Sequence, residues 1–119
     1  MSSEIRNAGI FAAKLSFHYR DGLAIMLLFD LGEGEIRRMH FSTKSPSLGF
    51  ELVSATLKTI GKSHWDNVAG SSCRIVTEGS RIIRIGNLLD DVWFDPQKIA
   101  DNDKRLEPAI AKAEEVGNE

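Results

Sequence analysis

Apolar and polar side chains alternate over long stretches in the first half of the chain. The alternation runs from residue 10 to residue 20 and again from 36 to 42, whereas residues 23–29 are apolar at every position. Alternation with a period of two is typical of a strand with one covered face, and an unbroken apolar run is typical of a central strand. Asp21-Gly22 favours a tight hairpin turn between the first two strands. The first half therefore predicts a three-stranded antiparallel meander that ends at residue 42.

The stretch after the meander has the spacing of an amphipathic helix. Ser45 can cap a helix whose first position is Pro46, and Gly61 can end it in the left-handed conformation. Between them, apolar residues recur every three or four positions; they are Phe50, Val53, Leu57 and Ile60. We predict one main helix that packs on the sheet.

The second half returns to strand-like patterns. Residues 72–77 and 81–87 predict a second hairpin, and residues 92–94 a short last strand that Asp95-Pro96 closes. Residues 1–96 are therefore expected to form a single α+β domain, with an antiparallel sheet and one main helix. Residues 97–119 are expected to be an acidic C-terminal tail, in which 108–116 have the spacing of a short amphipathic helix.

Composition narrows the class of protein. The chain has 119 residues, 42% hydrophobic and 27% charged, which are ordinary values for one globular domain. Its formal net charge is −2, and the negative charge is concentrated beyond residue 94, so no strongly basic domain favours general nucleic-acid binding. The longest apolar run is too short to span a membrane, and no secretion signal is evident. We expect a cytoplasmic protein with no membrane partner.

Candidate catalytic chemistry is sparse. The three histidines are far apart in the sequence and no Cys-x-x-Cys pair accompanies them, so we expect no metal site and no cofactor. The single cysteine, Cys73, excludes an internal disulfide and lies beside Arg74, which could lower its pKa. A small buried hydrophobe is the simpler interpretation of Cys73. We expect no enzyme.

Two sets of residues are better candidates for binding. The polar face of the meander, together with an aromatic residue at the last strand, forms the predicted partner-binding set: Lys14, His18, Arg20, Arg38, His40 and Trp93. Trp93 and Phe94 are adjacent, so one is expected to enter the core while a partner or the C-terminal tail covers the other. The second set, Arg74, Arg81 and Arg84 on the second hairpin, suits phosphate groups. Its alternative interpretation is a solvated surface with ion pairs.

The second half also carries a succession of short motifs. They are Gly61, Trp65-Asp66-Asn67-Val68-Ala69-Gly70, Cys73-Arg74-Ile75-Val76, Glu78-Gly79, Ile85-Gly86-Asn87 and Trp93-Phe94-Asp95-Pro96. This succession resembles a family of small uncharacterised phage and prophage proteins, over about residues 50–96. The resemblance implies a phage origin and offers no catalytic residues to carry over. Its fixed positions look structural, as turn glycines and core aromatics.

The resemblance favours a role in the cytoplasm of a host cell. The leading hypothesis is a non-enzymatic accessory protein that binds and inhibits a host defence protein, similar to an anti-CRISPR protein. The alternative is an oligomeric sponge that sequesters a nucleotide immune signal through the hairpin arginines. A nucleic-acid-binding accessory protein is a weaker alternative. Unpaired sheet edges also make a homodimer an expected arrangement.

Overall fold

Six antiparallel strands form a single sheet in the computed structural model, which describes residues 3–18, 20 and 22–99. The strands are β1 (Glu4–His18), β2 (Gly22–Gly32), β3 (Glu35–Thr43), β4 (Ser72–Glu78), β5 (Arg81–Asn87) and β6 (Trp93–Phe94). Their order across the sheet is β3-β2-β1-β4-β5-β6. Between β3 and β4 the chain forms helix α1 (Pro46–Ile60) and the short 3₁₀ helix η1 (Trp65–Asn67).

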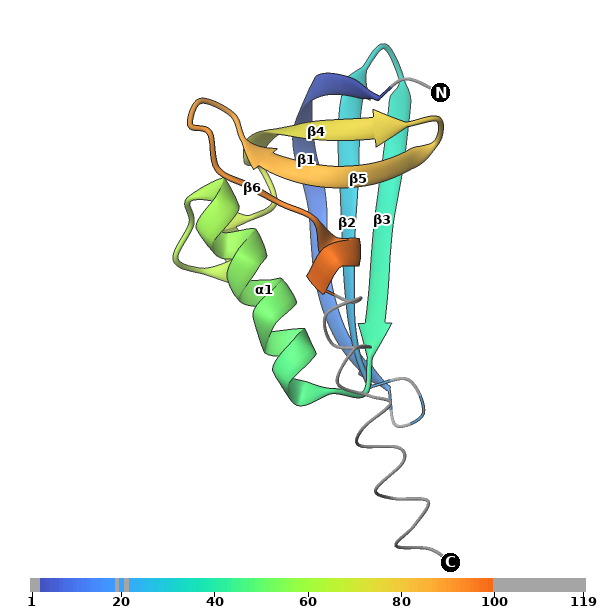
Figure 1. Ribbon diagram of the computed structural model, residues 1–119, viewed down its shortest axis with the longest axis vertical. Coiled ribbons are helices and arrows are strands. Elements are labelled where there is room, and N and C mark those ends of the chain that lie inside the picture. Colours follow the sequence, from blue (N-terminus) through green and yellow to red (C-terminus); the bar gives the residue numbers. More distant parts are fainter. Residues whose placement is uncertain (1–2, 19, 21, 100–119) are drawn as a thin grey trace, which may run out of the picture.

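Strand β1 belongs to both halves of the sheet and causes its curl. Residues 4–9 pair with β4, whereas residues 9–18 pair with β2. The β1–β2 register shifts between Ile10 and Ala12, and such a bulge bends the strand and increases the local twist. Strands β4 and β5 consequently cross in front of β1–β3 instead of extending them in one plane (Figure 1). The result is a curled half-barrel.

The expected α+β class is wrong, because the structure is mostly antiparallel sheet, with 53% strand and two short helices. The physical reason lies in β1, which begins at Glu4, in a polar stretch that precedes the alternating pattern. Its backbone pairs with β4, and this pairing merges the first three strands and the second hairpin into one curled sheet. The helix covers part of that sheet and is a minor component of the fold.

The core lies on the concave side of the sheet and is formed by residues of β1 to β5. Its largest fully buried side chains come from several strands; they include Phe29, Ile10, Leu27, Ile75 and Ile85. A second cluster joins α1 to the sheet through Leu48, Leu52 and Ile25. Burial of these side chains supplies the main stabilising free energy.

The ends of α1 follow the sequence-based expectation. The Leu48 amide donates to the Ser45 Oγ over 3.2 Å, and Pro46 occupies the first turn. Gly61 ends the helix with φ 83°, and its amide donates to the Leu57 carbonyl. The predicted start and end of this helix are confirmed.

The described chain continues past Phe94 into a helical turn at residues 96–99. Asp95 caps this turn by accepting a hydrogen bond from the Lys98 amide over 3.0 Å. Ile99 packs against the Leu48–Leu52 cluster. The helix predicted at 108–116 lies outside the described residues. Across the part of the chain that is described, no helix is long and apolar enough to cross a membrane.

Candidate binding surface

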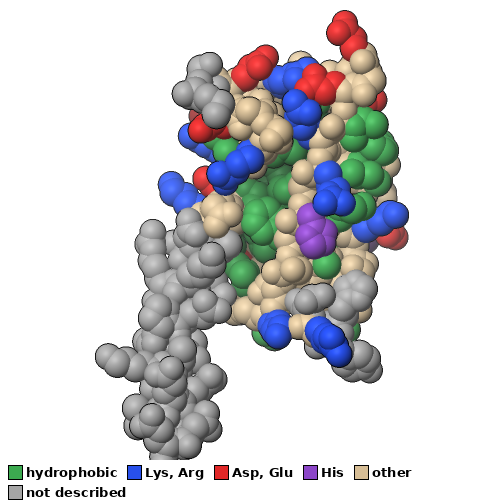
Figure 2. Space-filling model, turned by 90° about the vertical axis from the view of Figure 1, so that its right-hand side faces the viewer, with side chains coloured by type: hydrophobic (Ala, Val, Ile, Leu, Met, Phe, Trp, Pro, Cys, Tyr) green, Lys and Arg blue, Asp and Glu red, His purple; other side chains and the backbone are tan. Residues whose placement is uncertain are grey.

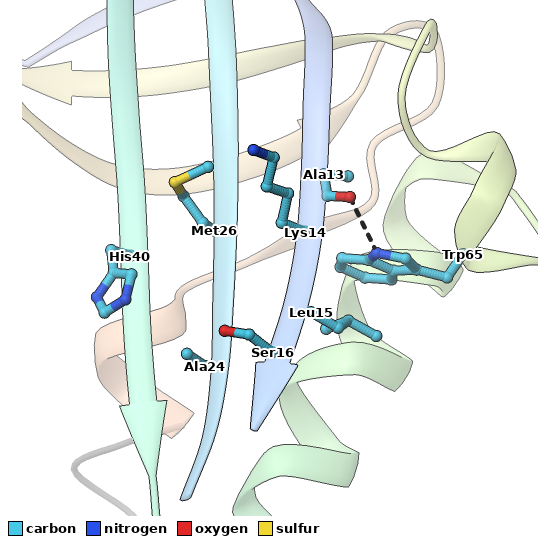
Figure 3. A pocket seen from close by; sticks show the side chains of 8 residues that line it. All are labelled: Ala13, Lys14, Leu15, Ser16, Ala24, Met26, His40 and Trp65. Atoms are coloured by element: carbon cyan, nitrogen blue, oxygen red, sulfur yellow. Dashed lines mark hydrogen bonds between the residues drawn. The ribbon is translucent and has the colours of Figure 1, made fainter. Parts of the chain in front are cut away.

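The convex side of β1–β3, which we call the outer face of the meander, combines apolar and cationic side chains. Strand register places Lys14 opposite Met26, and Met26 opposite His40, in one row across the three strands. The next row places Leu28 opposite Arg38. These side chains point away from α1, because their neighbours Ile25 and Phe41 pack on the helix side. Figure 3 shows Lys14, Met26 and His40 on this face.

A shallow hollow of about 470 Å³ lies on this face and extends around the edge of β1. It is lined by Ala13, Lys14, Leu15, Ser16, Ala24, Met26, His40 and Trp65 (Figure 3). Trp65 lies at the edge of β1, where its Nε1 donates to the Ala13 carbonyl over 3.3 Å. The indole thus covers part of a strand edge that β4 pairs with only up to Gly9. The hollow therefore has an aromatic wall at β1, with Lys14 and His40 beside its apolar side chains.

The cations on this face have no counter-charge in the part of the chain that the structure describes. Among the described residues, Lys14, Arg38 and His40 make no ion pair or side-chain hydrogen bond. The carboxylate at the end of this face, Asp30, accepts a hydrogen bond from the Gly32 amide over 2.8 Å. The face is therefore locally positive on a chain with a net charge of −2. An acidic partner would supply the missing counter-charges.

The structure brings together only part of the predicted partner-binding set. Lys14, Arg38 and His40 share the outer face of the meander. Arg20 is exposed in the turn after β1, and the side chain of His18 is outside what the structure describes. Trp93 lies on β6, at the opposite end of the sheet order from β3.

Trp93 and Phe94 do point to opposite sides of the sheet. Phe94 packs against the core, while the Trp93 ring lies on Gly86, whose missing side chain makes room for it. The guanidinium of Arg74 stacks 4.7 Å from the centroid of that ring, and the Trp93 Nε1 donates to Asp91 over 2.8 Å. Trp93 therefore has intramolecular partners on its ring and on its nitrogen.

The three hairpin arginines have different environments. Arg74 donates from Nε to the Asn87 carbonyl over 2.7 Å and from Nη2 to the Asp90 carbonyl over 2.9 Å. Arg84 lies one row along the same face, since Val76 pairs with Arg84 and Arg74 with Gly86. Arg81 lies at the far end of β5, in a cavity shared with β3. The Arg74 guanidinium is thus hydrogen-bonded to the loop that follows β5. The three arginines do not form a single patch.

Met26, Leu28 and Trp65 belong to this surface but were not among the predicted site residues. Met26 lies in an unbroken apolar run, a pattern that indicates cover on both faces, but it is half-exposed on the outer face. Trp65 belongs to the motif positions that the sequence analysis interprets as structural. Met26 could be assigned to this surface from its position opposite Lys14 and His40. That assignment depends on knowing which residues pair across the strands.

Candidate catalytic groups are not favourably placed. Burial raises the pKa of the Cys73 thiol from 9.0 to about 12, so the thiol stays protonated at neutral pH. Cys73 is also fully buried in the core. In residues 3–18, 20 and 22–99, no three His, Cys, Asp or Glu side chains gather closely enough to hold a metal ion.

The comparisons leave the fold and the surface as the basis for functional argument. Comparison with protein-family models, with curated proteins and with solved structures finds no match to this chain.

Proposed function

We propose that the protein is a non-catalytic binding protein that docks onto an acidic protein partner through the outer face of the meander. The observation that carries the proposal is the row of Lys14, Met26 and His40, extended by Leu28 and Arg38 in the next row. An apolar centre with a cationic rim has the composition of a protein interface, in which apolar contacts provide affinity and charges provide orientation.

The shape of the surface favours a protein partner over a substrate. The hollow is shallow and spans three strands, whereas a catalytic site requires converging groups around one reacting atom. Among the described residues that line it, the groups that could act as a nucleophile or base are Lys14, Ser16 and His40, and no hydrogen bond to a described residue positions them as a nucleophile would be. Binding is the function that this arrangement supports best.

Charge reversal on the surface tests the proposal. The double variant Lys14→Glu/Arg38→Glu is compared with the wild type and with Arg84→Glu, a matched reversal outside the meander, in quantitative affinity purification from host cells. We expect an acidic protein that the wild type and Arg84→Glu retain and the double variant loses, with unchanged thermal stability in all three. Identical recovery with the double variant would refute the surface assignment.

The resemblance to phage proteins supports a narrower form of the proposal, in which the partner is a host defence protein and binding inhibits it. Expression of the chain in bacteria that carry a CRISPR system, or another defence system, would then raise the plating efficiency of a targeted phage. Lys14→Glu/Arg38→Glu would abolish the effect. Unchanged plating across a panel of defence systems would reject inhibition and leave the binding surface to be judged by affinity purification.

A further inference from the structure

The curl of the sheet creates a second cavity, distinct from the hollow on the outer face. The β4–β5 hairpin turns back toward β3, and a cavity of about 320 Å³ lies between them. Its polar lining includes Arg38, His40, Ser80 and Arg81. Figure 2 looks onto the β3 side of the molecule and shows hydrophobic side chains in a hollow with Lys and Arg side chains around it. The cavity thus joins one arginine from each set of predicted site residues.

The arginines at this cavity differ from Arg6, Arg37 and Arg74, which have partners within the protein. Arg6 and Arg37 both pair with Glu35, at 2.8 Å and 2.7 Å, and Arg74 donates to two backbone carbonyls. Arg38 and Arg81 make no ion pair or side-chain hydrogen bond to any residue, within the described part of the chain.

Register even places Glu78 opposite Arg81, but no ion pair forms between them. Arg38 and Arg81 line the same cavity without a carboxylate partner among the described residues. Both guanidinium groups can therefore donate to one anion bound between β3 and the hairpin.

Most of the exposed lining of this cavity is polar, and its apolar part, which we call the floor, comes from Met39, Phe41 and Ile82. Met39 is 7% exposed, and Phe41 and Ile82 are partly buried beside it. An inorganic anion would leave this floor wet, whereas a ligand with an apolar body would cover it. The volume is near the lower end of the range for small-molecule sites, which is roughly 300–1,000 Å³.

We propose that this cavity binds a small phosphate monoester with an apolar body, with Arg38 and Arg81 holding the phosphate and Met39, Phe41 and Ile82 contacting the body. A phosphate monoester is favoured over a carboxylate because its charge of roughly −1.5 to −2 at neutral pH matches two guanidinium groups. The planar guanidinium donors suit two phosphate oxygens each. Ser80 provides a further hydroxyl donor at the hairpin tip.

The test is an NMR titration of the full-length protein with phenyl phosphate, with inorganic phosphate and phenol as separate probes. We expect saturable shifts of the backbone amides in residues 38–41 and 80–82, with phenyl phosphate binding more tightly than either fragment. Absence of saturation at millimolar concentration would overturn the site. Equal affinity for phenyl phosphate and inorganic phosphate would overturn the role of the apolar floor.

Two matched variants separate this site from the partner-binding surface. Arg81→Gln should weaken phenyl phosphate binding by roughly tenfold or more, since a charge-assisted hydrogen-bond pair is lost. Arg84→Gln, on the same strand, should bind as the wild type does, and so should Lys14→Glu, which belongs to the partner-binding surface alone. Shifts that persist in Arg81→Gln, or that vanish in Lys14→Glu, would contradict the assignment of the phosphate to this cavity.

Discussion

The outer face of the sheet has two halves, β1–β3 and β4–β6, and both contain cationic side chains beside apolar or aromatic ones. The halves differ in whether those side chains contact other residues of the protein. On β4–β6, Arg74 stacks on Trp93 and donates to two carbonyls, and the indole nitrogen donates to Asp91. On β1–β3, Lys14 and Arg38 surround an apolar centre and, among the described residues, make no such contacts. A cation beside an apolar or aromatic surface is therefore structural in one half and has no partner among the described residues in the other.

This difference shows why residue type alone does not identify a binding surface. Arg74 and Trp93 are the residue types most enriched at interface hot spots, yet here they organise the loop that follows β5. Asn87 completes that organisation, because its side-chain oxygen accepts from the amides of Leu89 and Asp90 and its nitrogen donates to Thr59. Whether a side chain can bind a partner depends on its contacts within the protein, and these contacts are known only from the three-dimensional structure.

The largest expected effect comes from filling the space under Trp93. In Gly86→Ala, the new Cβ would lie 2.4 Å from the Trp93 ring, so ring and strand must separate. We expect a loss of about 1–3 kcal/mol of unfolding free energy, measured by chemical denaturation. Gly9→Ala is the matched control, because nothing lies within 4 Å of the added Cβ. Equal stability of the two variants would show that Trp93 does not pack on Gly86.

A second comparison sets one arginine of each face against the other. Arg74→Ala removes the stacking on Trp93 and the hydrogen bonds to the Asn87 and Asp90 carbonyls, which should cost about 1–2 kcal/mol. Arg38→Ala removes no ion pair or side-chain hydrogen bond to a described residue and should change stability by less than about 0.5 kcal/mol. Thermal unfolding measures both. Similar destabilisation by the two substitutions would remove the contrast between the faces.

The smallest expected effect concerns the concave side. Because burial raises the pKa of Cys73 to about 12 from 9.0, the thiolate forms more readily in the unfolded chain. The unfolded state therefore loses its proton first as the pH rises above about 9, and stability falls from there towards pH 12. Cys73→Ser should lessen this decline in alkaline denaturation curves, because serine has no group that titrates in this range. An identical decline in both proteins would contradict the burial of the thiol.

Local patterns in the sequence predict much of the chain but not its overall arrangement. The ends of α1 depend on Ser45, Pro46 and Gly61. These residues act on their immediate neighbours, so a short segment of sequence is enough to predict where the helix begins and ends. The pairing of Glu4–Gly9 with β4 joins residues almost seventy positions apart, and nothing in the local pattern of either segment specifies it. Because of this pairing, the observed fold is a mostly β half-barrel and not the predicted α+β domain.

The candidate surface was predictable to a similar extent. Lys14, Arg38 and His40 share a face because each strand alternates, so period-two reasoning places them correctly relative to their own strands. Met26 and Trp65 required the register between strands and the packing of η1 against the edge of β1. The approach of Arg81 to Arg38 required the curl itself, which follows from pairing distant in sequence and from a bulge.

Photo-crosslinking in host cells tests the central claim most directly. A benzophenone amino acid replaces Met26, at the centre of the outer face of the meander, or Ile5, which is 64% exposed on the other half of the sheet. The account predicts a specific adduct with an acidic protein from position 26 and none from position 5. An adduct from position 5 alone, or the same adducts from both positions, would contradict the assignment of partner binding to the meander.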